Sequence, residues 1–152
     1  MFNKRIYILT AAVAVVGMAL AVGSAGASPS TYTVKATLST HGVSVKDATG
    51  ARGTLTGKLT VAGKHSAFVW TLRFNGLSGQ ARRAGIYFTK TKQLGMLLCL
   101  KCTSGARSSY HGSYVANKTF LNALLHRGFF VAIRTKLNPN GEIRGQLKTT
   151  AG

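Results

Sequence analysis

Large apolar side chains occupy every second position of the stretch that follows His65: Phe68, Trp70, Leu72 and Phe74. A period of two places all four on one side of an extended chain, whereas a helix would scatter them around its axis. We therefore expect a β-strand with one buried face. Trp70 is expected to anchor the core, and stacking of its indole on a ligand is the alternative interpretation.

The rest of the chain repeats this pattern in shorter segments. Its 18 glycines are spread out, and β-branched and aromatic residues fall between them, which is typical of short strands joined by turns. Met96 to Leu98 is apolar on both parities, so we expect burial on both faces of that strand. No Pro- or Gly-rich linker divides the chain, which indicates one all-β domain. In addition to residues 65–74, strands are expected at residues 32–38, 53–61, 84–89, 94–100 and 110–115.

The apolar spacing changes to that of a helix near residues 118–126. Apolar side chains between Phe120 and Leu125 fall on one helical stripe. Asn117 is expected to cap the amino end of this helix, and Gly128 to take the left-handed position beyond its carboxyl end. The same Asn begins an Asn-Lys-Thr glycosylation sequon, which is the alternative role for it.

A hairpin is expected near the carboxyl terminus. Its turn reads Asn-Pro-Asn-Gly, which combines a proline suited to the second turn position with a glycine that tolerates positive φ. Matching the apolar faces of the flanking strands pairs Leu137 with Ile143 and Ile133 with Leu147. That register implies a three-residue loop, 139–141.

The other face of this hairpin is basic. In the same register Asn138 opposes Glu142, and Lys136 and Arg144 lie on the face that carries the carboxylate. We expect Glu142 to be exposed and its charge to be offset by these two cations. An exposed pair of this kind contributes no more than about 1 kcal/mol.

Residues 1–27 have the organisation of a secretory signal peptide. Lys4 and Arg5 precede a long apolar run, and small residues lead to a cleavage site after Ala27. We expect a secreted or extracytoplasmic protein with a mature domain of residues 28–152 and no second membrane-spanning segment. Retention of the run as a membrane anchor is the alternative, because its length approaches that of a spanning helix.

The chain carries 20 Lys and Arg against two Asp and Glu, a formal net charge of +18. The two acids, Asp47 and Glu142, are far apart in the sequence. They therefore offer neither the paired carboxylates of general acid–base catalysis nor the carboxylate ligands of a calcium site.

So large a positive charge indicates an anionic partner: a cell-surface polymer, lipid head groups or extracellular nucleic acid. The alternative is that the charge only keeps an exported protein soluble. Specific nucleic-acid binding is not expected, because the sequence contains no motif for it. The candidate anion-binding residues flank the strand at 84–89 or lie in the last hairpin: Arg82, Arg83, Lys90, Lys92, Arg134, Lys136, Arg144 and Lys148.

The two cysteines, Cys99 and Cys102, are expected to form a disulfide in an exported protein. A fully extended segment would hold their Cα atoms about 10 Å apart, which is too far for the bond, so it requires a turn at Leu100 and Lys101. Free thiols and a redox-active pair are the alternatives. A redox pair usually begins a helix, whereas a loop-like sequence follows here.

Two stretches resemble the end of the CHRD domain, a family first named from chordin. They are residues 128–135 and 138–147, and the Gly-Glu-Ile-Arg-Gly-Gln segment is their most specific part. Upstream, the stretch from Phe68 to Leu77 with Gly79 is similar to the family as well, so the resemblance covers roughly residues 33–148. The motif positions to which the resemblance gives a structural role are Trp70, Gly128, Thr135, Pro139, Gly141, Glu142, Arg144 and Gly145.

The resemblance implies an exported, immunoglobulin-like antiparallel β-sandwich or barrel of about seven to nine strands, distantly like copper/zinc superoxide dismutase. The family often has three histidines where this chain has Gly85, Tyr87 and Arg134. Glycine has no side-chain donor and arginine keeps its proton, so we expect no metal site and no other cofactor.

Together these features predict a non-catalytic exported module, structural or binding, that associates with anionic surface polymers. A metal-binding, dismutase-like or redox enzyme is a disfavoured alternative. A protein-binding role by analogy with chordin is another, and the sequence identifies no protein partner.

Overall fold

The computed structural model describes residues 28–46, 50–63, 65–102 and 107–152, which form nine strands and one helix. The predicted signal peptide and Asp47 lie outside these residues. Within the described part, no helix has the length and apolar character needed to cross a membrane. The strands are β1 (Ser30–Ser39), β2 (Arg52–Ala62), β3 (His65–Asn75), β4 (Ala81–Phe88), β5 (Leu94–Leu100), β6 (Arg107–Val115), β7 (Phe129–Thr135), β8 (Ile143–Gln146) and β9 (Lys148–Ala151), and the helix is α1 (Lys118–Leu125).

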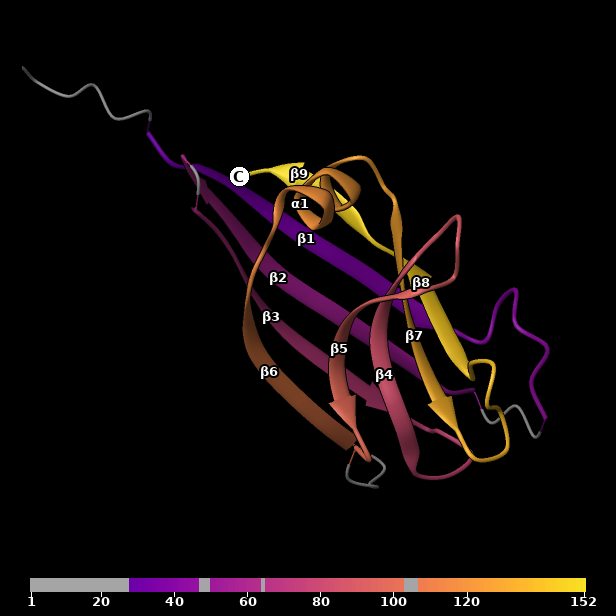
Figure 1. The fold of residues 1–152 in the computed structure, drawn as a ribbon. Coiled ribbons are helices and arrows are strands. Elements are labelled where there is room, and N and C mark those ends of the chain that lie inside the picture. Colours follow the sequence, from indigo (N-terminus) through magenta and orange to yellow (C-terminus); the bar gives the residue numbers. More distant parts are fainter. Residues whose placement is uncertain (1–27, 47–49, 64, 103–106) are drawn as a thin grey trace, which may run out of the picture.

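All the strand pairs are antiparallel, in the order β5-β4-β7-β8-β1-β2-β3-β6, and β9 pairs with β1. Strand β8 meets β1 through a single residue pair, Ser39 with Arg144, and there the sheet folds over itself. The result is two layers, β5–β4–β7–β8 and β1–β2–β3–β6, which face each other (Figure 1). The predicted all-β sandwich or barrel with one short helix is confirmed.

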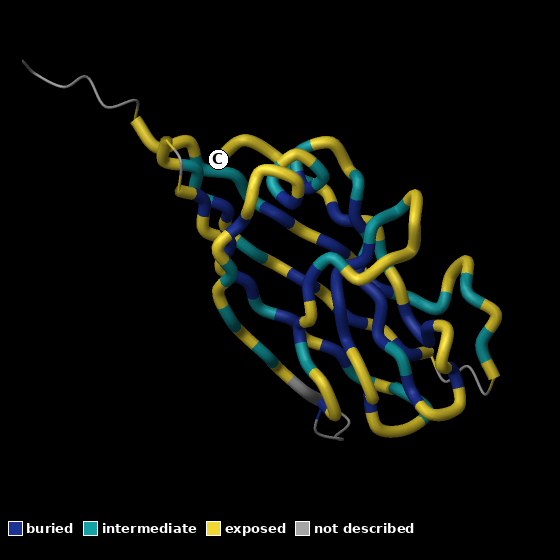
Figure 2. The backbone as a smooth tube through the Cα atoms, viewed as in Figure 1, coloured by how far each residue is buried: buried dark blue, intermediate teal, exposed yellow. Residues whose placement is uncertain are grey.

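The core lies between the layers, and buried and exposed residues alternate along strands such as β2 and β3 (Figure 2). In β3, the side chains of Phe68, Trp70, Leu72 and Phe74 are all buried, which confirms the strand with one buried face. The indole of Trp70 is only 5% exposed and belongs to the core cluster.

Strand β5 corrects one expectation. Met96 and Leu98 are buried, but Leu97 between them is 44% exposed, so burial on both faces was wrong. The reason is that β5 belongs to one layer of an antiparallel sandwich, in which the face toward the other layer packs on the core. Met96 and Leu98 are on that face, and Leu97 is on the opposite one.

Helix α1 closes one end of the sandwich beside β9 (Figure 1). Its buried side chains are Phe120 and Leu124. The predicted cap is confirmed, because the Asn117 side chain accepts a hydrogen bond from the Phe120 N–H at 2.8 Å. At the other end, the Thr149 hydroxyl of β9 donates to the Leu124 carbonyl at 2.8 Å, which fastens the helix to the sheet.

The residue predicted to take the left-handed position after the helix was wrong by one position. Arg127, not Gly128, takes the left-handed position, with φ of 56°. Gly128 follows it, and its N–H donates to the Ala123 carbonyl at 2.7 Å. A Cβ on Gly128 would lie 3.1 Å from that carbonyl oxygen, so the glycine is needed for close approach to the helix rather than for positive φ.

The register predicted for the last hairpin is wrong. Strands β7 and β8 pair Ile133 with Ile143 instead of with Leu147, so the connection is longer than three residues. Leu137, which the prediction placed on the apolar face, is 46% exposed. The turn itself is present, because the Gly141 N–H donates to the Asn138 carbonyl at 3.1 Å. The extra length lets the chain fold inward before β8 begins.

A substitution at Gly145 tests the close contact between β8 and β1. A Cβ at this position would overlap the backbone carbonyl of Thr37 on β1. Replacing Gly145→Ala is expected to lower the free energy of unfolding by about 3 kcal/mol, because backbone must move to admit the methyl group. Urea unfolding measures this.

The matched control is Gly79→Ala, at a position where a Cβ meets nothing within 4 Å. It is expected to change stability by less than about 0.5 kcal/mol. Equal stabilities for the two variants would contradict the close approach of β8 to β1.

Candidate functional site

Five cationic side chains gather where β4 begins and where β5 and β7 end. These three ends meet because β4 is antiparallel to both of its neighbours (Figure 1). The hollow between them has a volume of about 430 Å³ and is also lined by Gln80, Thr135 and Pro139. We call it the basic pocket, and its cations are Arg82, Arg83, Lys101, Arg134 and Lys136.

A β-bulge places two adjacent arginines at the pocket. Strand β4 pairs Ala81 with Thr135 but Arg83 with Arg134, so Arg82 is an extra residue in β4. In a regular strand, neighbouring side chains point to opposite faces. The bulge breaks that alternation, so Arg82 and Arg83 are both exposed.

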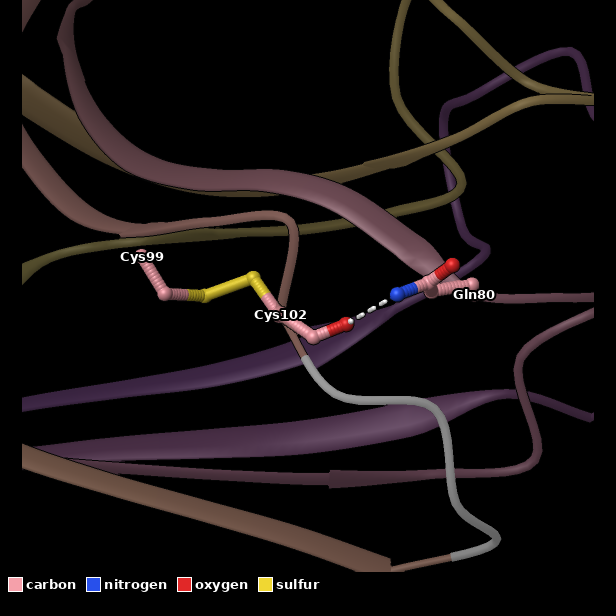
Figure 3. Close-up of a disulfide and its surroundings, with 3 residues drawn as sticks. All are labelled: Gln80, Cys99 and Cys102. Carbon is pink, nitrogen blue, oxygen red and sulfur yellow. Dashed lines mark hydrogen bonds between the residues drawn. A yellow bond between two sulfur atoms is a disulfide. The ribbon is translucent and has the colours of Figure 1, made fainter.

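The fifth cation, Lys101, lies in the turn that is closed by the Cys99–Cys102 disulfide, and Figure 3 shows this disulfide. Cys99 and Cys102 are joined with their Cα atoms 5.6 Å apart, and Lys101 between them has φ of 49°. The Lys101 N–H donates to the Arg82 carbonyl at 2.9 Å, and the Gln80 side-chain amide donates to the Cys102 carbonyl at 3.3 Å. The turn is therefore held against the start of β4.

Lys101 was not among the predicted anion-binding residues. The sequence does contain one clue to its position: a bond between Cys99 and Cys102 requires a turn, and Lys101 occupies that turn. The sequence does not show which strand the turn lies against, and that contact brings Lys101 to Arg82.

Arg134 is held by aromatic stacking. Its guanidinium carbon lies 4.7 Å from the centroid of the Tyr87 ring, and Tyr87 stacks on Phe130 with centroids 5.6 Å apart. Tyr87 is 2% exposed. The stack keeps Arg134 half-buried at the wall of the pocket and restricts its side chain.

The same stack occupies positions where the resembled family often has histidine. Tyr87 and Arg134 contact each other there, and a Cβ on Gly85 would come within 2.6 Å of Leu94. In the part of the chain that the structure describes, no three His, Cys, Asp or Glu side chains come together in a way that could hold a metal ion.

Glu142 lies behind the pocket and is only 1% exposed. Its carboxylate accepts hydrogen bonds from the N–H and hydroxyl of Ser78, both at 2.5 Å, from the Thr135 hydroxyl at 2.6 Å and from the Asn138 amide at 3.0 Å. The prediction of an exposed carboxylate was wrong. The neutral donors that surround this carboxylate replace its water, so it does not need a cation at the surface.

The environment of Glu142 acts on its pKa in two directions. Burial raises the pKa, and the hydrogen bonds from Ser78, Thr135 and Asn138 lower it by more, so the pKa lies below its ordinary value. The carboxylate is therefore ionised at neutral pH, with uncharged donors as its hydrogen-bond partners. Among the described residues, none of the five pocket cations has an ion-pair partner, and their charge is available to an external anion.

The other candidate cations lie elsewhere. Lys92 and Arg144 line a second hollow of about 460 Å³, together with His41 and Gln146. Lys148 lies on β9 opposite Lys35 of β1, and Lys90 lines neither hollow. The basic pocket thus unites four of the eight predicted residues: Arg82, Arg83, Arg134 and Lys136.

The motif residues have distinct structural positions. Thr135 and Glu142 are hydrogen-bonded to each other, and Pro139 lines the pocket. Gly141 has φ of 127°, a conformation that L side chains rarely adopt.

Comparison with known proteins gives one match. A family model described as the CHRD domain matches residues 21–147, a span that includes the whole basic pocket. Neither the curated proteins nor the solved structures contain a significant match to the chain.

Acid titration tests the Glu142 network. Because its folded-state pKa is lowered, the stabilisation is present above the unfolded-state pKa and is lost as pH falls through the folded-state pKa. The free energy of unfolding should therefore fall with pH below about pH 5. In Glu142→Gln this fall should be largely absent, and the variant should be about 2 kcal/mol less stable at pH 7, because one acceptor oxygen becomes a donor.

The measurement is urea unfolding of both proteins across the acid range. The comparison is simple because the only other Asp or Glu in the sequence is Asp47. An acid dependence of equal size in wild type and Glu142→Gln would refute the assignment.

Proposed function

The chain belongs to the CHRD domain family, and from this premise we propose that it is an exported, non-catalytic module whose basic pocket binds an anionic group of a surface polymer. The observation that carries the proposal is the convergence of five cations on one hollow. Among the described residues, none of the five has an ion-pair partner. An external anion would supply the negative charge that these cations lack within the described part of the chain.

The chemistry of the pocket favours phosphate, sulfate or carboxylate. The guanidinium groups of Arg82, Arg83 and Arg134 are suited to two-point hydrogen bonding with such groups, and lysine adds compact positive charge. A volume of about 430 Å³ fits one or two charged sugar-sized units. Binding through such contacts releases counterions and weakens as salt concentration rises.

The side chains around the pocket support a binding role rather than a catalytic one. Glu142 accepts four hydrogen bonds and is buried, so it is not positioned to exchange protons with a ligand. Cys102 is 1% exposed, and its disulfide partner lies at the end of a strand rather than at the start of a helix. Both features favour a structural role for the cysteine pair.

Export is part of the same proposal. Residues 1–27 carry the signal-peptide pattern, and a disulfide persists in an oxidising compartment. Anionic polymers of a cell surface would then be within reach of the pocket.

A charge-matched pair of double variants tests the pocket. Arg83→Gln with Lys136→Gln removes two pocket cations, and Lys90→Gln with Lys118→Gln removes two exposed cations outside it. Both lower the net charge equally. The pocket variant should bind a heparin tetrasaccharide at least about tenfold more weakly, because each lost contact is charge-assisted. The control should change less than about twofold.

A salt titration of tetrasaccharide binding completes this test. The slope of log affinity against log salt should decrease in the pocket variant and stay unchanged in the control. Equal losses in the two variants would show that only net charge matters. Absence of binding to heparin, DNA and cell-wall polymer, even at low ionic strength, would refute the proposal.

A further inference from the structure

The outer face of the other layer is also cationic. In β1, β2 and β3 the inward positions carry the core, so the alternate positions point to solvent (Figure 2). Those outward positions, with one from β9, hold five exposed cations. We call this surface the cationic face, and its cations are Lys35, Arg52, Lys58, Arg73 and Lys148.

Strand register interleaves these cations with hydroxyl and amide side chains. Across β2, β3 and β6, Arg73 lies between Thr54 and Ser109. Nearer the end of the sheet, Arg52 lies between Ser39 of β1 and Asn75 of β3. Neighbouring strands are about 4.8 Å apart, so each of these arginines is flanked by hydrogen-bonding groups at close spacing.

Lys35 and Lys58 each have a threonine on one side only. Lys35 lies between Lys148 of β9 and Thr56 of β2. Lys58 lies between Thr33 of β1 and the exposed Val69 of β3. Lys35 and Lys58 are diagonal neighbours, which stand about 7–8 Å apart across a sheet. The cations thus form a band across four strands rather than a single cluster.

No carboxylate neutralises this band within the described residues. Glu142 is the one Asp or Glu they include, and it is buried in its hydrogen-bond network away from this face. A hollow of about 480 Å³ lies over the arginine end of the face, lined by Arg52, Thr54 and Arg73. The face therefore offers extended, uncompensated positive charge with hydroxyls between the charges.

These features point to the chemistry of the occupant. A linear polymer whose repeat alternates phosphate with hydroxyl groups complements interleaved cations and threonines. Single-stranded nucleic acids are bound largely by stacking of bases on aromatic rings. The tyrosines of β1 and β6, Tyr32, Tyr110 and Tyr114, instead pack against the core. Of the described outward positions on this face, only His65 and His111 carry a ring, and both are histidines.

The two positively charged surfaces lie on opposite sides of the molecule. The basic pocket is on the layer that contains β4, β5 and β7, the cationic face is on the other layer, and the core separates them (Figure 1). A single chain of a polymer cannot easily occupy both at once without wrapping around the domain.

We propose that the cationic face binds a polyol phosphate chain independently of the basic pocket, so that one molecule bridges two anionic polymer chains. The bridging rests on the proposed function of the pocket, whereas binding at the cationic face does not. Two sites on one rigid domain convert simple binding into cross-linking of the polymer.

Light scattering with long poly(glycerol phosphate) tests the proposal on the full chain. Three double variants of equal charge change are compared with wild type: Lys35→Gln with Arg73→Gln on the face, Arg83→Gln with Lys136→Gln in the pocket, and Lys90→Gln with Lys118→Gln as control. Wild type and control should produce large particles at low salt. The face and pocket variants should each still bind polymer, but their scattering should fall at least about tenfold, because one site cannot bridge.

The outcomes separate the two proposals. A face variant that cross-links as well as the control would overturn the present inference and leave the pocket untouched. A pocket variant with normal tetrasaccharide binding would overturn the proposed function. If the pocket does not bind, the face variant should lose polymer binding altogether, and that loss would still support the cationic face. Equal cross-linking of single-stranded DNA of matched charge would overturn the assignment to polyol phosphate. Scattering from protein without polymer controls for self-association.

Discussion

The buried carboxylate of Glu142 connects the parts of the molecule that form the basic pocket. It accepts hydrogen bonds from Ser78 in the β3–β4 connection, from Thr135 at the end of β7 and from Asn138 in the connection to β8. Asn138 in turn exchanges two hydrogen bonds with the backbone of Lys46, between β1 and β2. A buried charge must be satisfied by such donors, so one side chain fixes three connections at one end of the sandwich.

That arrangement affects the electrostatics around the basic pocket. A carboxylate at the surface would form ion pairs with Lys136 and Arg144 and remove part of the positive charge. Held inside by uncharged donors, Glu142 leaves those cations without an ion-pair partner among the described residues. Their positive charge therefore remains at the surface, where an anionic polymer can reach it.

Much of the fold could be predicted from local patterns. Alternation at Phe68, Trp70, Leu72 and Phe74 identified β3, and capping chemistry at Asn117 identified the start of α1. The hairpin register could not be predicted in the same way. Matching apolar faces favoured the pairing of Leu137 with Ile143, and it took no account of the donors that bring Glu142 into the interior. These donors lie in the β3–β4 connection, at the end of β7 and in the β7–β8 connection, and Ser78 in the first of these is 64 residues away from Glu142 in the sequence.

The sequence by itself determined a β-rich domain with one short helix, one pair of cysteines and a large excess of positive charge, because strand period, capping residues and composition are local or additive properties. Tertiary structure decided which cations meet. Arg82 reaches the pocket through a bulge, Lys101 through a disulfide turn set against β4, and Lys35 and Arg73 share a face through strand register. Each of these depends on pairing between distant segments, which the spacing of residues along one chain does not encode.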